Sequence, residues 1–192
     1  DKDDIYKFLA ILLCLIASFR WKVGGDWETY LTIYERSRLD SINFNWSIIF
    51  EFINYIFSSL KTGVYGVNLL ISSLFFIALY RLAKSLNFDL LLILIIAVSL
   101  IYFNGIMGYV RQTLSLIFFM FSLDQYYKNK KEVSFFLYTI SIFNHVASII
   151  FLPIYLFTYL KNLKAILFII IISFIGVILG FDILKITFYE FV

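Results

Sequence analysis

The feature that most constrains this chain is a series of long apolar runs separated by short islands of charge. A helix needs about 20 predominantly apolar residues to cross a bilayer, within a range of about 17–25. Only 15% of the residues are charged, whereas a soluble domain has about a quarter. The sequence therefore predicts an all-α fold, a polytopic integral membrane bundle with spans at residues 5–19, 64–82, 88–103, 106–127, 133–160 and 165–181.

The organisation of the chain predicts a single transmembrane domain over residues 1–192. No internal repeat or low-complexity linker divides the sequence. The chain begins with Asp1 rather than methionine and ends at Val192 without a polar tail. We therefore expect it to be a segment of a longer polytopic protein.

The charges between the apolar runs predict an orientation. With a cytoplasmic N-terminus, the basic loops 81–84 and 128–131 face the cytoplasm, as the positive-inside rule requires. The run 133–160 is too long for one ordinary span, and Asn144-His145 interrupts it. If the run breaks there into two short helices, the basic residues of 161–164 also face the cytoplasm. We therefore expect a broken or re-entrant helix pair.

The long connection 20–61 is then extracytoplasmic, and its second half predicts an amphipathic helix. Apolar residues recur there at helical spacing: Trp46, Ile49, Phe50, Ile53, Phe57 and Leu60. Polar residues fill the opposite face at the same period: Ser47, Glu51, Asn54 and Ser58. Two interpretations stay open, a helix along the membrane surface and a helix packed on the outer face of the protein itself.

Arg111 is the most informative single residue, because it lies inside an apolar run. An arginine at the centre of a membrane helix costs about 2.5–3.5 kcal/mol on insertion scales, so it normally faces a bundle interior or a wet cavity. Gly108, Ser115 and Ser122 share its helical face, and we expect this small, polar face to point inward. The alternative is an arginine that reaches the interface or is held in an internal ion pair.

Two further candidates are His145 and Asp26. His145 is the only histidine of the chain, and it is either a functional residue near the outer surface or a packing residue. A metal role is not expected, because one histidine without a cysteine partner is a poor transition-metal site. Asp26 follows a double glycine and heads a stripe with Tyr30 and Tyr34, although an aspartate there can also serve only as a helix N-cap.

The predicted topology brings Arg20, Asp26, Arg111, Gln112 and His145 to one side of the membrane at similar depth. Cations beside a carboxylate and an imidazole suit an anionic substrate, since arginine binds phosphate oxygens in pairs. The sequence has no phosphate-binding loop, zinc-protease motif or serine nucleophile elbow. The net charge of +3 is too small to indicate a nucleic-acid partner.

At these residues the chain resembles the EpsG family of membrane proteins, related to the Wzy-type polymerases of O-antigen and capsular polysaccharide. The resemblance rests on Phe19-Arg20 through Gly24-Gly25-Asp26, on Val110-Arg111-Gln112, and on Phe143-Asn144-His145 before Leu152-Pro153-Ile154-Tyr155. The amphipathic segment 46–60 is also similar.

This resemblance implies a polymerase at the outer face of the cytoplasmic (inner) membrane. Such an enzyme transfers a glycan from an undecaprenyl diphosphate carrier to another lipid-linked repeat unit, with no cofactor and no metal. On this reading, the chemistry of the residues suggests catalytic roles for Asp26, Arg111 and His145, and substrate binding by Arg20, Gly25, Tyr30 and Gln112. Arg111, together with Arg20, would hold diphosphate, Asp26 or His145 would accept the proton, and Tyr30 would stack on a sugar. The expected partners are lipid-linked oligosaccharide, membrane lipid and other proteins of glycan assembly.

Two other functions stay open at this point. A transporter or flippase of a lipid-linked or anionic solute would use the same cavity without breaking a bond. Transporters place their sites near the midplane of the membrane, whereas the polar residues here concentrate in the outer half. A non-catalytic membrane subunit of a glycan assembly complex would tolerate the loss of all three catalytic candidates.

Overall fold

The computed structural model describes residues 1–38, 47–153 and 155, and its regular elements there are all helices. The all-α prediction is thereby confirmed for this part of the chain. In order, the elements are α1 (Lys2–Ser18), α2 (Trp27–Arg38), α3 (Ile48–Ser59), α4 (Val64–Ser85), α5 (Leu90–Ala97), the π-helix η1 (Val98–Ile106), α6 (Val110–Tyr127), α7 (Lys131–Asn144) and the 3₁₀-helix η2 (Val146–Phe151).

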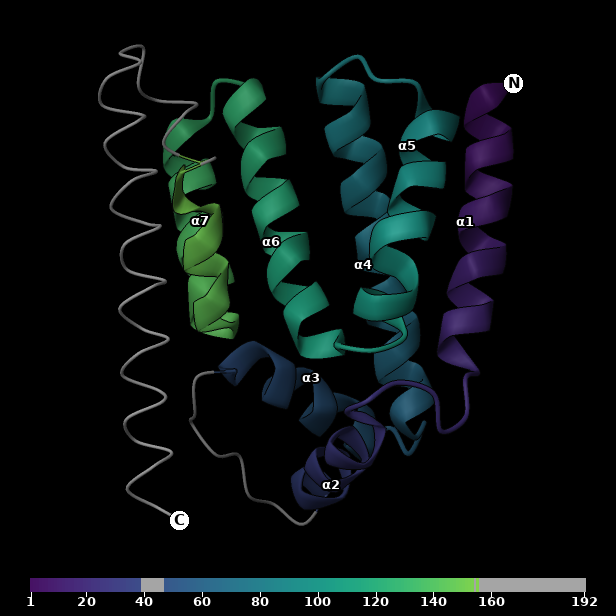
Figure 1. The fold of residues 1–192 in the computed structure, drawn as a ribbon. Coiled ribbons are helices and arrows are strands. Elements are labelled where there is room, and N and C mark those ends of the chain that lie inside the picture. The colour runs from purple at the N-terminus through teal and green to yellow at the C-terminus, as the bar shows by residue number, and fades with distance from the viewer. Residues whose placement is uncertain (39–46, 154, 156–192) are drawn as a thin grey trace, which may run out of the picture. The chain divides into compact units, whose positions relative to one another are not determined.

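The chain divides into two compact units, Asp1–Ser148 and Ile149–Val192. The contacts described below lie within the first unit. In it, α1, α4, α5 with η1, α6 and α7 run up and down, and α2 and α3 lie across one end (Figure 1). We call this the α2–α3 end. The opposite end, which holds the N-terminus and the α4–α5 and α6–α7 turns, is the N-terminal end.

One described helix, α4, is both long and apolar enough to cross a membrane, at 22 residues. Ile48–Ser59 and Leu90–Ile106 are apolar but shorter. The helical class is therefore established for the described residues, while the polytopic membrane bundle and the single domain over 1–192 remain predictions.

The break predicted at Asn144-His145 is confirmed. Helix α7 ends at Asn144, and His145 has an extended backbone, with φ −155° and ψ 114°, before η2 begins. After the break, the chain lies against α7 again. The hydroxyl of Tyr138 donates to the carbonyl oxygen of Ser148 at 3.3 Å. The second half of the predicted helix pair, with residues 161–164, lies outside the described residues.

A seam of buried serines joins α6 to α7, the most extensive helix contact in the unit. The Ser141 hydroxyl donates to the Ser115 carbonyl at 2.8 Å, and the Ser122 hydroxyl donates to the Ser134 carbonyl at 2.7 Å. Small side chains let two helices approach closely in an apolar environment. The inward direction predicted for Ser115 and Ser122 is confirmed, but Gly108 lies in the turn before α6 and not on its face.

The predicted amphipathic helix forms as α3, but its polar face points the other way. The polar stripe of Ser47, Glu51, Asn54 and Ser58 is buried, between 1% and 5% exposed. Phe50 and Ile53 of the predicted apolar stripe are buried as well, whereas the exposed side of the helix carries Ile48, Phe52 and Leu60, which are 47%, 53% and 63% exposed. The buried side of the helix packs on α2, α4 and α7. For that side, the predicted alternative of a helix packed on the protein itself is the one observed.

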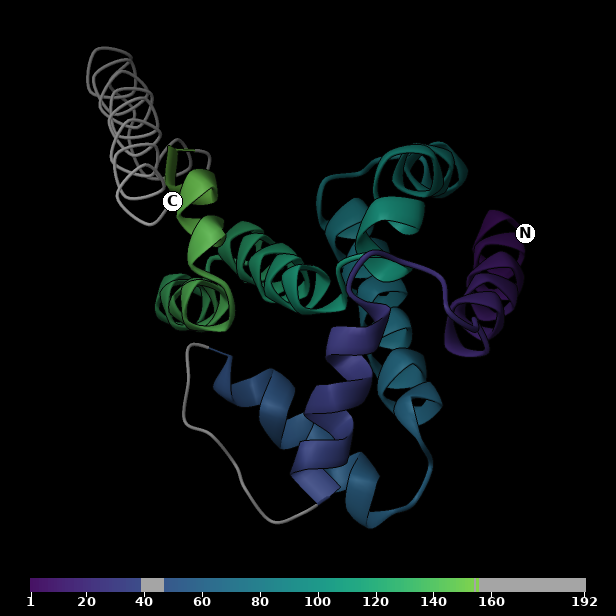
Figure 2. The ribbon, with the colours of Figure 1, turned by 60° about the horizontal axis from the view of Figure 1, so that its bottom comes forward.

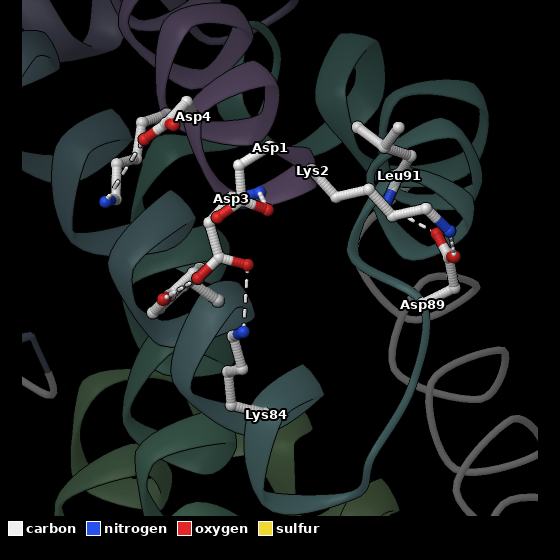
Figure 3. Close-up of polar contacts among 9 residues, drawn as sticks. Asp1, Lys2, Asp3, Asp4, Lys84, Asp89 and Leu91 are labelled. Atoms are coloured by element: carbon white, nitrogen blue, oxygen red, sulfur yellow. Dashed lines mark hydrogen bonds and ion pairs between the residues drawn. The ribbon is translucent and has the colours of Figure 1, made fainter.

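Ion pairs fasten the N-terminal end. Asp89 caps the start of α5, accepting from the backbone N–H of Leu91 at 3.0 Å, and it pairs with Lys2. Asp3 pairs with Lys84 of α4 at 2.8 Å (Figure 3). The basic segments 81–84, at the end of α4, and 128–131, between α6 and α7, which the sequence assigns to one side of the membrane, do lie at the same end.

The most buried of these charges is Asp124 of α6, whose side chain is fully enclosed. It pairs with Arg81 at 2.9 Å and with Lys128 at 2.6 Å, and it accepts from the Ser85 hydroxyl at 2.5 Å. A carboxylate withdrawn from water is stable only when its oxygens are paired in this way. This cluster therefore joins α4 to α6.

At the other end, the connection between α1 and α2 is held against the turn between η1 and α6. The guanidinium of Arg20 donates to the carbonyl oxygen of Ile106 at 3.0 Å. Gly24 has φ +104°, and a Cβ placed on it would lie 2.2 Å from the carbonyl oxygen of Met107. Only glycine fits that position, for its backbone conformation and for space.

We predict that Asp124→Asn lowers the free energy of unfolding by about 1–3 kcal/mol, because it leaves two partly exposed cations without their anion. Thermal unfolding in detergent measures this change. Asp4→Asn is the control, since that side chain is 74% exposed and its nearest cation is at 3.9 Å. Equal stability of the two variants would contradict the role given to Asp124.

We predict that Gly24→Ala destabilises the protein by about 1–3 kcal/mol, through backbone strain and the clash with Met107. Gly25→Ala is the matched control, because a Cβ there meets only the Tyr109 hydroxyl, at an ordinary 3.8 Å. The same unfolding measurement compares them. Similar losses at both glycines would show that the close approach of Gly24 is unimportant.

Candidate functional site

The residues singled out by the sequence all lie at the α2–α3 end, which Figure 2 turns toward the reader. Arg20 and Gly25 belong to the connection after α1, Asp26 and Tyr30 to the start of α2, Arg111 and Gln112 to the first turn of α6, and His145 to the end of α7. These segments are far apart in the sequence. Their common end follows from the alternating directions of the helices.

Tyr30 connects two of the three catalytic candidates. Its hydroxyl donates to Oδ2 of Asp26 at 3.2 Å and accepts from the backbone N–H of Arg111 at 3.5 Å. Burial, with the charge of Asp26 beside it, raises the pKa of Tyr30 to about 12. The phenol therefore stays protonated and holds the carboxylate near the start of α6.

The aromatic ring of Tyr30 is not placed to stack on a sugar. The residue is 6% exposed, and its ring packs edge-on against Phe50 of α3, with the centroids 5.5 Å apart. Sequence reasoning treated the ring as open because a helical stripe does not show what covers it. In the structure Tyr30 lies between α2, α3 and α6, where it bonds to Asp26 and to the backbone N–H of Arg111.

Arg20 is likewise drawn into the protein. It is 5% exposed, lies over the Trp27 ring at 5.7 Å and bonds to the last carbonyl of η1. Burial lowers the pKa of its guanidinium. Its contacts are those of a residue that fastens the loop carrying Gly25 and Asp26, so direct contact with a substrate is not its evident role.

Arg111 is half-buried and lines a polar pocket of 370 Å³. The other lining residues come from α2 and α3: Thr29, Thr32, Ile33, Arg36, Ser47 and Glu51. Arg36 donates from Nη2 to Oε1 of Glu51 at 3.0 Å. The pocket thus holds two guanidinium groups and one carboxylate, and this net positive charge suits the binding of an anion at the Arg111 side.

Arg36 and Glu51 are site residues that sequence reasoning missed. The sequence places Glu51 on the polar face of the predicted amphipathic helix, and it does not single out Arg36. The signal was present in the regular spacing of the polar stripe, but only the packing of α3 shows that this stripe faces α2 and α6.

His145 lies within electrostatic reach of Arg111. Burial, and then the positive charge of Arg111, lower the pKa of its imidazole below the ordinary value of 6.5. The ring is therefore neutral at pH 7, which suits a proton acceptor better than an anion-binding cation.

Gln112 and Gly25 are both exposed at this end of the unit. In the described part of the chain, no cluster of three or more histidine, cysteine, aspartate or glutamate side chains is arranged to hold a metal ion.

Buried polar atoms without a hydrogen-bond partner gather toward the α2–α3 end. Within the described residues they are Arg20 Nε, Trp27 Nε1, Arg36 Nε, Glu51 Oε2, Asn68 Nδ2 and Asn144 Oδ1. Such groups are uncommon in folded proteins because each costs about 1–3 kcal/mol. At the N-terminal end, the carboxylates of Asp3, Asp89 and Asp124 are all paired and stabilise the fold. At the α2–α3 end, the unpartnered polar atoms are available to hydrogen-bond a ligand.

An apolar groove of 470 Å³ lies elsewhere, between α1 and α4. Its lining is almost entirely apolar and aromatic, with Tyr6, Cys14 and Phe76 among its residues. It lacks the convergent charges that a reaction needs, so the candidate site is the pocket of Arg36, Glu51 and Arg111, flanked by Asp26 and His145.

Comparison with known proteins identifies the family of the chain. A model of the EpsG family matches residues 5–192, a range that includes every candidate residue. No curated protein and no solved structure matches the chain. The family is one of membrane-associated, polymerase-like proteins of polysaccharide biosynthesis. Because the match extends over nearly the whole sequence, this chain belongs to the EpsG family.

Proposed function

We propose that the protein is a membrane polysaccharide polymerase. It transfers a glycan from an undecaprenyl diphosphate carrier to a sugar hydroxyl of another lipid-linked repeat unit, at the outer face of the cytoplasmic membrane. The observation that carries the proposal is Arg111, half-buried at the start of α6 in a polar pocket, at the end of the unit where Asp26 and His145 also lie.

The chemistry follows from these groups. The hydroxyl oxygen of the acceptor attacks the anomeric carbon of the donor glycan, and the bond from that carbon to the diphosphate oxygen breaks. The electron pair leaves with the diphosphate, whose growing negative charge the guanidinium of Arg111 stabilises. The hydroxyl proton passes to the neutral ring of His145. The sugar–diphosphate bond supplies the free energy, so no cofactor is needed.

Other residues support this arrangement. Asp26 accepts from the Tyr30 hydroxyl, which also receives the N–H of Arg111, and together they fix the start of α6. Arg20 holds the loop on which Gly25 and Asp26 lie. Asp26 is the second candidate for the proton acceptor. Gln112, exposed in the first turn of α6, is a candidate for contact with the polar part of the donor.

The sidedness of the proposal comes from the loop charges. The basic segments 81–84 and 128–131 lie at the N-terminal end, opposite the pocket. By the positive-inside rule this end faces the cytoplasm, and the pocket then opens toward the extracytoplasmic side. Lipid-linked oligosaccharide, membrane lipid and other glycan assembly proteins are its proposed partners.

We predict that Arg111→Ala abolishes long glycan chains, with a loss of rate of about 100-fold to 1,000-fold, as expected for a group that stabilises leaving-group charge. Arg111→Lys is also impaired, because an ammonium lacks the planar pair of donors. Purified protein is incubated with lipid-linked repeat units and the glycan lengths are measured. Lys22→Gln, which removes an exposed cation at the same end, is the control and keeps full activity.

Three outcomes would contradict the proposal. Normal glycan lengths with Arg111→Ala would remove this residue from the mechanism. Movement of repeat units between leaflets without longer glycan, in the unmodified protein, would make it a transporter. The protein would be a non-catalytic subunit if it is inactive when purified and its triple variant still supports glycan assembly in cells. That variant combines Asp26→Ala, Arg111→Ala and His145→Ala.

We predict that His145 titrates below pH 6.5, and that Arg111→Gln moves its pKa upward by removing the nearby positive charge. Polymerisation therefore declines as the pH falls through the His145 pKa, and in Arg111→Gln the residual activity declines at a higher pH. NMR of labelled histidine reports this directly, because the chain has only one. An unchanged His145 pKa in Arg111→Gln, or an equal shift of that pKa in Lys22→Gln, would show that the charge of Arg111 does not specifically act on His145.

A further inference from the structure

The pocket between α2, α3 and α6 contains one carboxylate oxygen that no group in the described part of the chain uses. Glu51 is 5% exposed, and Arg36 bonds to its Oε1 at 3.0 Å. Its other oxygen, Oε2, is buried and has no hydrogen-bond partner among the described residues. Glu51 lines the pocket, together with Arg36 and Arg111. A buried carboxylate oxygen without a partner is costly, so it marks a place where a ligand can bond.

The chemistry of this oxygen limits the kind of ligand. An ionised carboxylate only accepts hydrogen bonds, so it repels a phosphate and requires a ligand that donates. The two guanidinium groups in the same pocket disfavour a cation. A neutral hydroxyl meets both conditions. Arg36 also has an unpartnered buried donor, Nε, and a carboxylate beside a guanidinium can bond two neighbouring hydroxyls, one as acceptor and one as donor.

We propose that Arg36 and Glu51 form a subsite for the sugar of the acceptor repeat unit, with Glu51 Oε2 accepting from a sugar hydroxyl. Thr29 and Thr32 line the same pocket from α2. Arg111 borders the subsite from α6 and faces the anionic donor. This assignment rests on the proposed function, because only a polymerase has an acceptor sugar to bind. It makes α3 a substrate-binding helix.

The kinetic test compares Glu51→Gln with Ser58→Ala. Glu51→Gln keeps the size of the side chain but removes its charge, so the KM for the acceptor rises by about 10-fold to 100-fold, while the KM for the donor is unchanged. Ser58 belongs to the same buried stripe but does not line the pocket, so Ser58→Ala leaves both values unchanged. An unchanged acceptor KM in Glu51→Gln, or an equal rise in Ser58→Ala, overturns the subsite.

A binding test separates this subsite from the polymerase proposal. Thr32→Cys places a thiol in the pocket, in a Cys14→Ser background that removes the only native cysteine. A lipid-linked repeat unit is expected to slow labelling of this thiol by a maleimide, and Glu51→Gln is expected to abolish the protection. Inorganic diphosphate is the comparison and is expected to protect less than the repeat unit does.

The outcomes of the two tests are distinguishable. Protection that depends on Glu51, in a protein that never lengthens glycan, retains the sugar subsite and rejects the polymerase. If the protein polymerises glycan and the repeat unit protects the thiol equally with and without Glu51→Gln, the subsite is rejected and the polymerase is retained. Protection by diphosphate alone shows that the pocket binds an anion, which also overturns the subsite.

Discussion

The arrangement of this protein depends on one constraint, that polar groups removed from water need partners. The two ends of the first unit meet this constraint differently. At the N-terminal end, Asp124 is fully enclosed and has two cations and a serine hydroxyl as partners. At the α2–α3 end, the carboxylate of Glu51 and the guanidinium of Arg36 are paired on one side only. The first arrangement supports the fold, and the second leaves bonding capacity for a ligand.

The α2–α3 layer is what turns a bundle end into a site. Helix α3 buries its polar stripe together with Phe50 and Ile53, and it exposes Ile48, Phe52 and Leu60. An exposed apolar face of this kind is stable where it meets an apolar medium. Glu51 of the buried stripe lines a pocket with residues of α2 and with the half-buried Arg111 of α6, and partial exclusion of water strengthens the electrostatic interactions there.

The candidate residues divide into those that border the pocket and those that hold its walls. Arg111 borders the pocket, and its charge reaches His145. Tyr30 and Arg20, which the sequence made substrate-binding candidates, instead bond to the backbone of α6 and η1. A buried aromatic or cationic side chain near a site is often there to fix the geometry of others, and a wall that moves by an ångström can cost much of the rate.

The sequence by itself determined the helical class, the positions of the helices, the break at Asn144-His145 and the end at which the candidate residues gather. These follow from local patterns, since apolar runs and their period depend on residues close in the chain. The face that α3 buries, the burial of Tyr30 and Arg20, and the pairing of Arg36 with Glu51 were decided only by the tertiary structure. Each depends on which helices meet, because a polar stripe on one helix does not reveal whether water, lipid or another polar stripe lies opposite.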